Sequence, residues 1–174
     1  PSVSGVSFHA AYQNAAQTGS VNTYSDMGIK IAPEAVEGLE IGYATGEYDE
    51  SATVLGVDVS TMYVKYSYGS FTVGYQQSED DGPSTATTDE SDSWAVSYAV
   101  SEDLSVSYNS SKLNFETAGT EDQDAVGISA SYTMGSMTLA GVINSVDNQG
   151  AGATGAGNTD TNTDTYEVNL SFAF

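Results

Sequence analysis

The segment TYEVNLSFAF, residues 165–174, alternates large apolar side chains with small or polar ones up to the last residue. Successive side chains of a β-strand point to opposite faces. One face of this strand therefore carries only apolar side chains, namely Tyr166, Val168, Leu170, Phe172 and Phe174. The end of a soluble domain is usually polar and poorly ordered. The segment is predicted to lie against apolar surroundings along its whole length.

The 174-residue chain is strongly acidic, with 24 Asp and Glu against 3 Lys and Arg and a formal net charge of −21. This balance argues against nucleic acid as a partner, because phosphates need basic side chains. The absence of cysteine excludes disulfides and cysteine-ligated metals. The 12 tyrosines distinguish the chain from acidic disordered segments. Its length suits a single domain over residues 1–174.

The same alternation recurs along the chain and predicts ten strands, near 6–12, 27–31, 39–43, 62–68, 71–75, 94–100, 104–108, 126–134, 137–143 and 166–174. The connections between these strands alternate in length. Short turns are expected near 33–38, 69–70, 101–103 and 135–136. Long acidic loops are expected near 13–22, 46–57, 78–92, 111–124 and 145–164.

One uncharged stretch, residues 125–146, is long enough to cross a bilayer as a helix. Three glycines interrupt it, and Ser and Thr occupy alternate positions. Gly135-Ser136 in its middle suits a tight turn, so the stretch is predicted to form two strands of a hairpin.

Loops sorted by length and strands with one apolar face are typical of an antiparallel up-and-down transmembrane β-barrel, an all-β fold. A strand of about ten residues, tilted by about 45°, covers about 23 Å, close to the apolar band of about 25 Å. Only helices and closed barrels satisfy every backbone group in lipid. The alternative is a soluble β-sandwich, whose strands also alternate but whose loops need not sort by length.

With these features the sequence resembles bacterial outer-membrane porins. Its terminal alternation, ending in Phe174, resembles the C-terminal signature that the outer-membrane assembly machinery recognises. The strands, hairpin turns and acidic loops resemble the alphaproteobacterial type of general porin. The resemblance implies a homotrimer in the Gram-negative outer membrane, surrounded by lipid and lipopolysaccharide. It also implies extracellular long loops, with the short turns and the C-terminus in the periplasm.

Porins of this type usually have sixteen strands. A closed barrel of ten strands would be narrow, and its interior would need side chains large enough to fill it. The inward registers instead carry mostly Ser, Ala, Gly, Thr and Asn, which suit a wide lumen filled with water. The chain is therefore expected to be the C-terminal ten strands of a larger porin.

Few charged or titratable residues fall on the inward registers: His9, Asp26, Lys30, Glu40, Lys65 and Glu167. We expect them to line the pore and to bias ion passage, as rings of charge do in channels. The alternative is that some are solvated residues of the rim. With three lysines and no arginine in the chain, a basic cluster on the barrel wall would be weak, so cation preference is expected.

No cofactor is expected. The acidic stretches at 79–92 and 121–124 offer the oxygen ligands that Ca²⁺ prefers, but they lack the spacing of an EF-hand. A solvated acidic surface is favoured over loosely bound Ca²⁺. Catalysis has little support in a chain with one His and no Cys, so no enzyme is expected, although a Ser-His-Asp arrangement is recognised by geometry and not by order.

The sequence thus favours a channel for passive diffusion of small hydrophilic solutes and ions. The alternative is a small ten-stranded barrel of the outer membrane that acts as an adhesin or surface-interaction protein.

Overall fold

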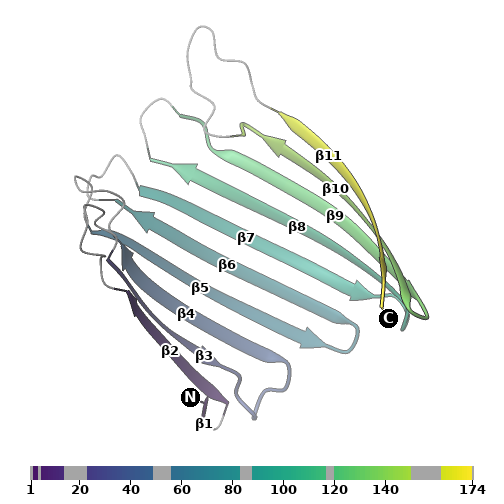
Figure 1. Cartoon of the computed structure of the whole chain (residues 1–174), viewed down its shortest axis with the longest axis horizontal. Coiled ribbons are helices and arrows are strands. Elements are labelled where there is room, and N and C mark those ends of the chain that lie inside the picture. The colour runs from purple at the N-terminus through teal and green to yellow at the C-terminus, as the bar shows by residue number, and fades with distance from the viewer. Residues whose placement is uncertain are drawn as a thin grey trace, which may run out of the picture.

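The computed structural model describes residues 2–3, 5–13, 23–48, 56–82, 88–116, 120–149 and 162–173. The regular secondary structure within these ranges consists of β-strands alone. None of the described residues forms a helix long and apolar enough to cross a membrane. The strands build one antiparallel sheet in which each strand is hydrogen-bonded to the next in sequence (Figure 1).

The sheet contains eleven strands: β1 (Ser2–Val3), β2 (Val6–Gln13), β3 (Tyr24–Ile31), β4 (Leu39–Tyr48), β5 (Val57–Tyr68), β6 (Phe71–Asp81), β7 (Thr88–Ala99), β8 (Leu104–Phe115), β9 (Gln123–Met134), β10 (Met137–Asp147) and β11 (Thr163–Phe172). The ten predicted strands are confirmed. The two-residue strand β1 was not predicted. It pairs with the start of β2 through a turn in which Gly5 has φ 78°.

Strands extend into all five of the predicted long loops, and residues 78–92 show this most clearly. The assignment of residues 78–92 to a loop is wrong at both ends, because β6 continues to Asp81 and β7 begins at Thr88. Facing carboxylates such as Asp80 and Asp89 are unfavourable cross-strand partners. The hydroxyl of Thr88 donates to Oδ1 of Asp81 at 2.8 Å, which supports the last pair of the ladder.

The predicted short turns are confirmed at Gly69-Ser70 and Gly135-Ser136, each of which joins two strands directly. The glycines have φ 57° and 62°, and the serines have negative φ, as at the two central positions of a type II′ turn. Ser101 organises the turn before β8. Its Oγ accepts hydrogen bonds from the N–H groups of Asp103 at 3.2 Å and Leu104 at 3.1 Å.

One face of the sheet is apolar along the middle of the strands and toward their short turns, whereas charged residues such as Glu79 and Glu90 lie on it near the long loops. A row of facing residues crosses it from β4 to β11 and consists of Leu39, Tyr66, Val73, Val96, Tyr108, Ile128, Ile143 and Tyr166. Aromatic rings meet on this face: Phe71 stacks on Tyr98 with centroids 4.4 Å apart, and Trp94 lies 5.1 Å from Tyr108. Nothing among the described residues covers this face, and no hydrophobic residue described on it is buried.

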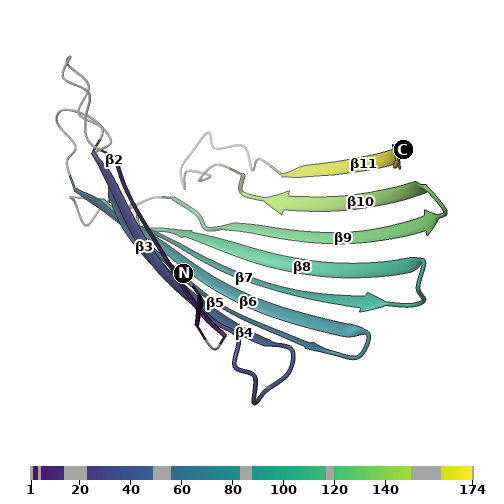
Figure 2. The same cartoon turned by 60° about the horizontal axis from the view of Figure 1, so that its bottom comes forward.

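The sheet is curved into an open trough (Figure 2). Its two edges, formed by β2 with the short β1 and by β11, are not hydrogen-bonded to one another. The described strands therefore confirm the antiparallel up-and-down order but form an open sheet, not a closed ring.

Replacing Ile128 with Arg tests whether the apolar face contacts hydrocarbon. Ile128 lies in the middle of β9 and is 57% exposed. A charged side chain at the middle of a membrane strand costs about 2–4 kcal/mol when it faces lipid. We expect the Ile128→Arg variant to lose stability of this order in equilibrium urea unfolding of the protein folded into lipid vesicles.

The matched control is Ala95→Arg, which places the same charge on the polar face of β7. This variant should lose little stability. Equal losses in the two variants would show that the two faces do not differ in their surroundings.

Candidate functional site on the polar face

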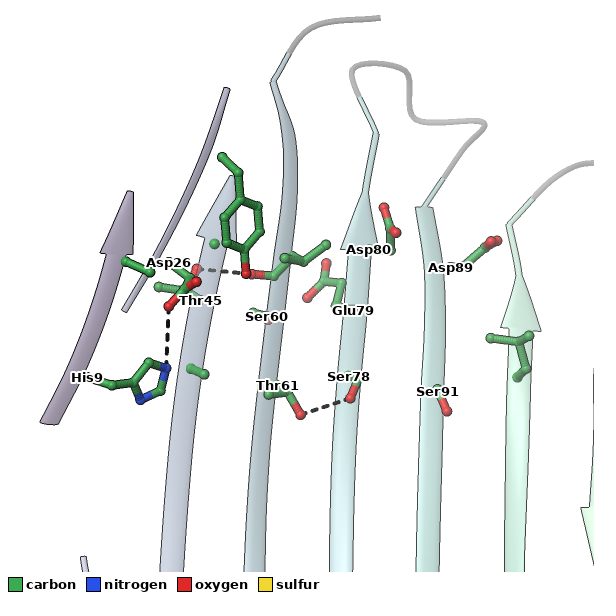
Figure 3. A pocket seen from close by; sticks show the side chains of 16 residues that line it. His9, Asp26, Thr45, Ser60, Thr61, Ser78, Glu79, Asp80, Asp89 and Ser91 are labelled. Atoms are coloured by element: carbon green, nitrogen blue, oxygen red, sulfur yellow. Dashed lines mark hydrogen bonds and ion pairs between the residues drawn. The ribbon is translucent and has the colours of Figure 1, made fainter. Parts of the chain in front are cut away.

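Small side chains leave the polar face of the sheet open. From Lys65 on β5, the facing residues along one row are Gly74, Ala95, Asn109, Gly127, Asn144 and Thr165. Hydroxyl groups pair between strands, as between Thr61 and Ser78 at 2.9 Å and between Ser107 and Ser129 at 2.7 Å. A hollow of about 850 Å³ lies on this face over β2 to β8 (Figure 3). Such a surface can hold water along its length.

Three of the predicted residues form one ionic cluster near the short-turn ends of their strands. Glu40 on β4 faces Lys65 on β5 in the ladder. Its Oε1 lies 3.2 Å from Nζ of Lys65, and its Oε2 lies 3.5 Å from Nζ of Lys30 on β3. Two ammonium groups thus share one carboxylate, and the cluster has a net charge of +1. The sequence placed these residues on one face without indicating that they meet.

A second pair lies closer to the long-loop ends of the strands. Nε2 of His9 on β2 is 3.5 Å from Oδ1 of Asp26 on β3, and the two side chains point toward each other in Figure 3. The hydroxyl of Tyr24 also bonds to Asp26. Glu167 lies at the far side of the sheet on β11, where the amide of Asn169 donates to its Oε1. The structure therefore joins five of the six predicted residues into two groups on neighbouring strands.

Several polar-face residues were missed by sequence reasoning. Asp80 and Asp89 had been assigned to a loop, but they face each other in the ladder of β6 and β7, and Asp80 accepts a hydrogen bond from Tyr48 at 3.3 Å. Continuing the alternation outward from the Gly69-Ser70 turn would have placed Asp80 on this face. The alternation placed Tyr63 on the face of Lys65 but did not mark it as a candidate site residue, although its hydroxyl donates to Oε1 of Glu40 at 3.0 Å.

Glycines make room for rings that lie across the strands. Gly28 faces His9 and Gly42 faces Tyr63. A Cβ at either glycine would overlap the ring of its partner. Gly74 lies on the same face, yet the nearest atom to its Cβ position is 3.8 Å away. Gly28 and Gly42 therefore leave the space that the rings of His9 and Tyr63 occupy. Gly74 has no such ring against it.

The acidic residues do not gather into a metal centre in the part of the chain that the structure describes. No group of three or more His, Cys, Asp and Glu side chains is placed there to hold a metal ion. The acidic residues of β6 and β7 belong to paired strands, which do not wrap around an ion as a binding loop does. The expectation of a solvated acidic surface, favoured over loosely bound Ca²⁺, stays a prediction.

Comparison with known protein families gives a match to the Gram-negative porins that covers residues 1–174. The chain belongs to the Gram-negative porin family. No curated protein matches its sequence. Membership implies the outer membrane and points to a channel, not an enzyme. It also agrees with the sheet, in which an uncovered apolar face opposes a polar one. The alphaproteobacterial type stays a prediction.

The third lysine of this porin forms a separate ion pair beyond the cluster. Nζ of Lys112, close to the end of β8, lies 2.8 Å from Oδ2 of Asp122 in the connection to β9. The hydrogen bond from the Lys112 ammonium holds the pKa of the Asp122 carboxyl below its usual range. The pair ties the two strands together outside their regular ladder.

Removing Lys112 should raise the pKa of Asp122. Because folding lowers this pKa, the contribution of Asp122 to stability is present above its unfolded-state pKa and is lost as pH falls through the folded value. In the Lys112→Met variant, carboxyl carbon chemical shifts measured by NMR should place the titration of Asp122 at higher pH. The Lys30→Met variant is the control and should leave this titration unchanged. An unchanged titration in Lys112→Met would contradict the assignment.

Proposed function

We propose that this porin forms a water-filled channel through which small hydrophilic solutes and ions diffuse passively, with a preference for cations. The observation that carries the proposal is the two-faced sheet, with an uncovered apolar side and an opposite side of small polar residues. Diffusion through such a channel needs no chemistry. The width of the lumen sets the size limit, and charges on the wall bias the flux of ions.

The charges of the polar face support cation preference. Among the described strands it carries five carboxylates and two ammonium groups, a surplus of three negative charges. We assign to the channel wall His9, Asp26, Lys30, Glu40, Lys65 and Glu167, together with Asp80 and Asp89. The carboxylates of Asp26, Asp80 and Asp89 border the hollow near the outer ends of the strands, where cations would gather.

We further propose that the barrel closes through strands beyond those described, to a total of sixteen. Unpaired backbone groups cost several kcal/mol each in lipid, so the edges at β2 and β11 need hydrogen-bonding partners. The small residues of the polar face suit the aqueous lumen that barrels of 16–18 strands enclose. A trimer is expected from the resemblance to general porins.

Electrical recordings in planar bilayers test these proposals together. We expect the full-length protein to insert as a unit that closes in three equal steps, each step corresponding to one pore. In a salt gradient the reversal potential should have the sign of a cation-preferring channel. Anion preference would contradict the proposed charge bias, and a protein that does not conduct would favour a surface-interaction role.

The double variant Lys30→Met and Lys65→Met is the matched charge test. It removes two positive charges from the wall and should move the reversal potential further toward the value for a purely cation-selective pore. Lys112→Met removes one positive charge outside the proposed lumen and should have much less than half of this effect.

We also propose the orientation of the chain, with long loops outside the cell and short turns with the C-terminus in the periplasm. On β11 the side chains of Tyr166, Val168, Leu170 and Phe172 are exposed on one face, which supports the proposal that the assembly machinery recognises this strand. Phe174 lies outside the described residues. Contact of the outer loops with lipopolysaccharide follows from the same orientation.

Single cysteines test this orientation, because the chain has no cysteine of its own. A maleimide reagent too large to pass a porin should label the Glu116→Cys variant, between β8 and β9, in intact cells. It should label Ser70→Cys, in the turn between β5 and β6, only after the outer membrane is permeabilised. The reverse pattern would contradict the proposed orientation.

A further inference from the structure

We propose that Tyr63 is a positioning residue that fixes Glu40 between Lys30 and Lys65, and so sets the charge that this part of the wall presents to passing ions. The inference rests on the proposed channel function and concerns how the channel selects among ions. Tyr63 carries no charge itself, so any effect on selectivity has to act through the residues that it holds.

The carboxylate of Glu40 on β4 contacts side chains from both neighbouring strands, β3 and β5. The Tyr63 hydroxyl donates to its Oε1 at 3.0 Å, and Nζ of Lys65 lies 3.2 Å from the same oxygen. Its other oxygen faces Lys30 at 3.5 Å. The Glu40 side chain is 23% exposed, whereas Lys30 and Lys65 are 51% and 47% exposed. The carboxylate therefore lies against the wall while the two ammonium groups reach the open space.

The two ion pairs alone are weak restraints. Exposed pairs contribute little to stability, and salt screens them. A lysine also loses much rotamer freedom when its ammonium group is held in one place. Tyrosine has only two side-chain torsions that position its ring and a hydroxyl at a fixed distance from the backbone. Of the partners of Glu40, Tyr63 is therefore the one that can define the position of the carboxylate.

Gly42 fixes the ring of Tyr63. The two residues face each other across β4 and β5, and a Cβ at position 42 would overlap the ring. Since Glu40 precedes Gly42 by two residues on β4, both share the polar face. The ring crosses β4 at the glycine, and its hydroxyl reaches the carboxylate next along that face. The space at Gly42 and the hydrogen bond to Glu40 thus both restrict the position of the Tyr63 side chain.

The consequence for ions follows from charge compensation. While Glu40 is held, its negative charge offsets one of the two ammonium groups at close range. When it is released, the lysines separate from the carboxylate and extend into the lumen with less compensation. The wall then presents a more positive charge, and the permeability ratio moves toward anions even though the number of charges is unchanged.

Reversal potentials of the full-length protein in planar bilayers test this inference. The Tyr63→Phe variant keeps the ring and loses only the hydroxyl. Loss of one hydrogen bond to a charged group should lower the ratio of held to released Glu40 by about tenfold. The permeability ratio should therefore move toward anions, by less than in Glu40→Gln, which removes the compensating charge altogether.

Two comparisons separate positioning from a change in pore shape. In a Glu40→Gln background, Tyr63→Phe should produce no further shift, because no charge remains for Tyr63 to hold. Gly42→Ala should shift selectivity in the same direction as Tyr63→Phe, because the added methyl group would displace the ring of Tyr63. Gly74→Ala adds the same methyl group to the same face where it meets nothing within 3.8 Å, and should leave selectivity unchanged.

The inference is overturned if a conducting Tyr63→Phe channel keeps the wild-type permeability ratio, or if the shift is equal with and without Glu40. Either outcome leaves the channel itself intact. Failure of the wild-type protein to conduct would instead overturn the channel proposal. If Gly42→Ala does not fold, the Tyr63→Phe comparison in both backgrounds still decides the question.

Discussion

The structure depends on the pairing of every backbone N–H and C=O group with a neighbouring strand. In hydrocarbon no water can take the place of such a bond. This requirement explains why each strand of the sheet is paired with the next in sequence and why two-residue turns can join neighbouring strands directly at one end of the sheet. The backbone hydrogen bonds also contribute more than the side chains to specifying which strands pair. Each face needs only a general character, apolar or polar, because the backbone pairing already specifies the arrangement of the strands.

The sequence was informative where one residue decides a local geometry. Alternation located the ten long strands, and the Gly-Ser pairs located two turns in which only the first residue needs positive φ. The prediction was wrong where β6 ends and β7 begins, because Asp and Glu are typical of loops. Nothing in the local sequence indicates that Glu79 still faces Glu90 across a ladder. The short strand β1 was missed because two residues are too few to display a period.

The candidate site was harder to predict because it depends on contacts between strands. Alternation alone placed Lys30, Glu40 and Lys65 on one face. Their meeting follows from the register, in which Glu40 faces Lys65 and Lys30 faces Gly42. The role of Tyr63 could not be read from its own position, because it depends on the missing side chain of its partner Gly42. Had the registers been counted outward from the Gly69-Ser70 turn, Tyr63 would have emerged as a residue placed opposite a glycine.

Trp94 gives this protein a practical property. It is the only tryptophan in the chain, and it lies on the apolar face, 46% exposed, with its ring 5.1 Å from that of Tyr108 on the neighbouring strand. Indole emission depends on the polarity of its surroundings, so one native fluorophore reports the transfer of this face from water to membrane. Energy transfer to the indole from the nearby phenols of Tyr108 on β8 and Tyr75, which faces Trp94 from β6, reports the assembly of these strands around β7. Insertion and strand assembly can thus be followed optically without attaching a dye.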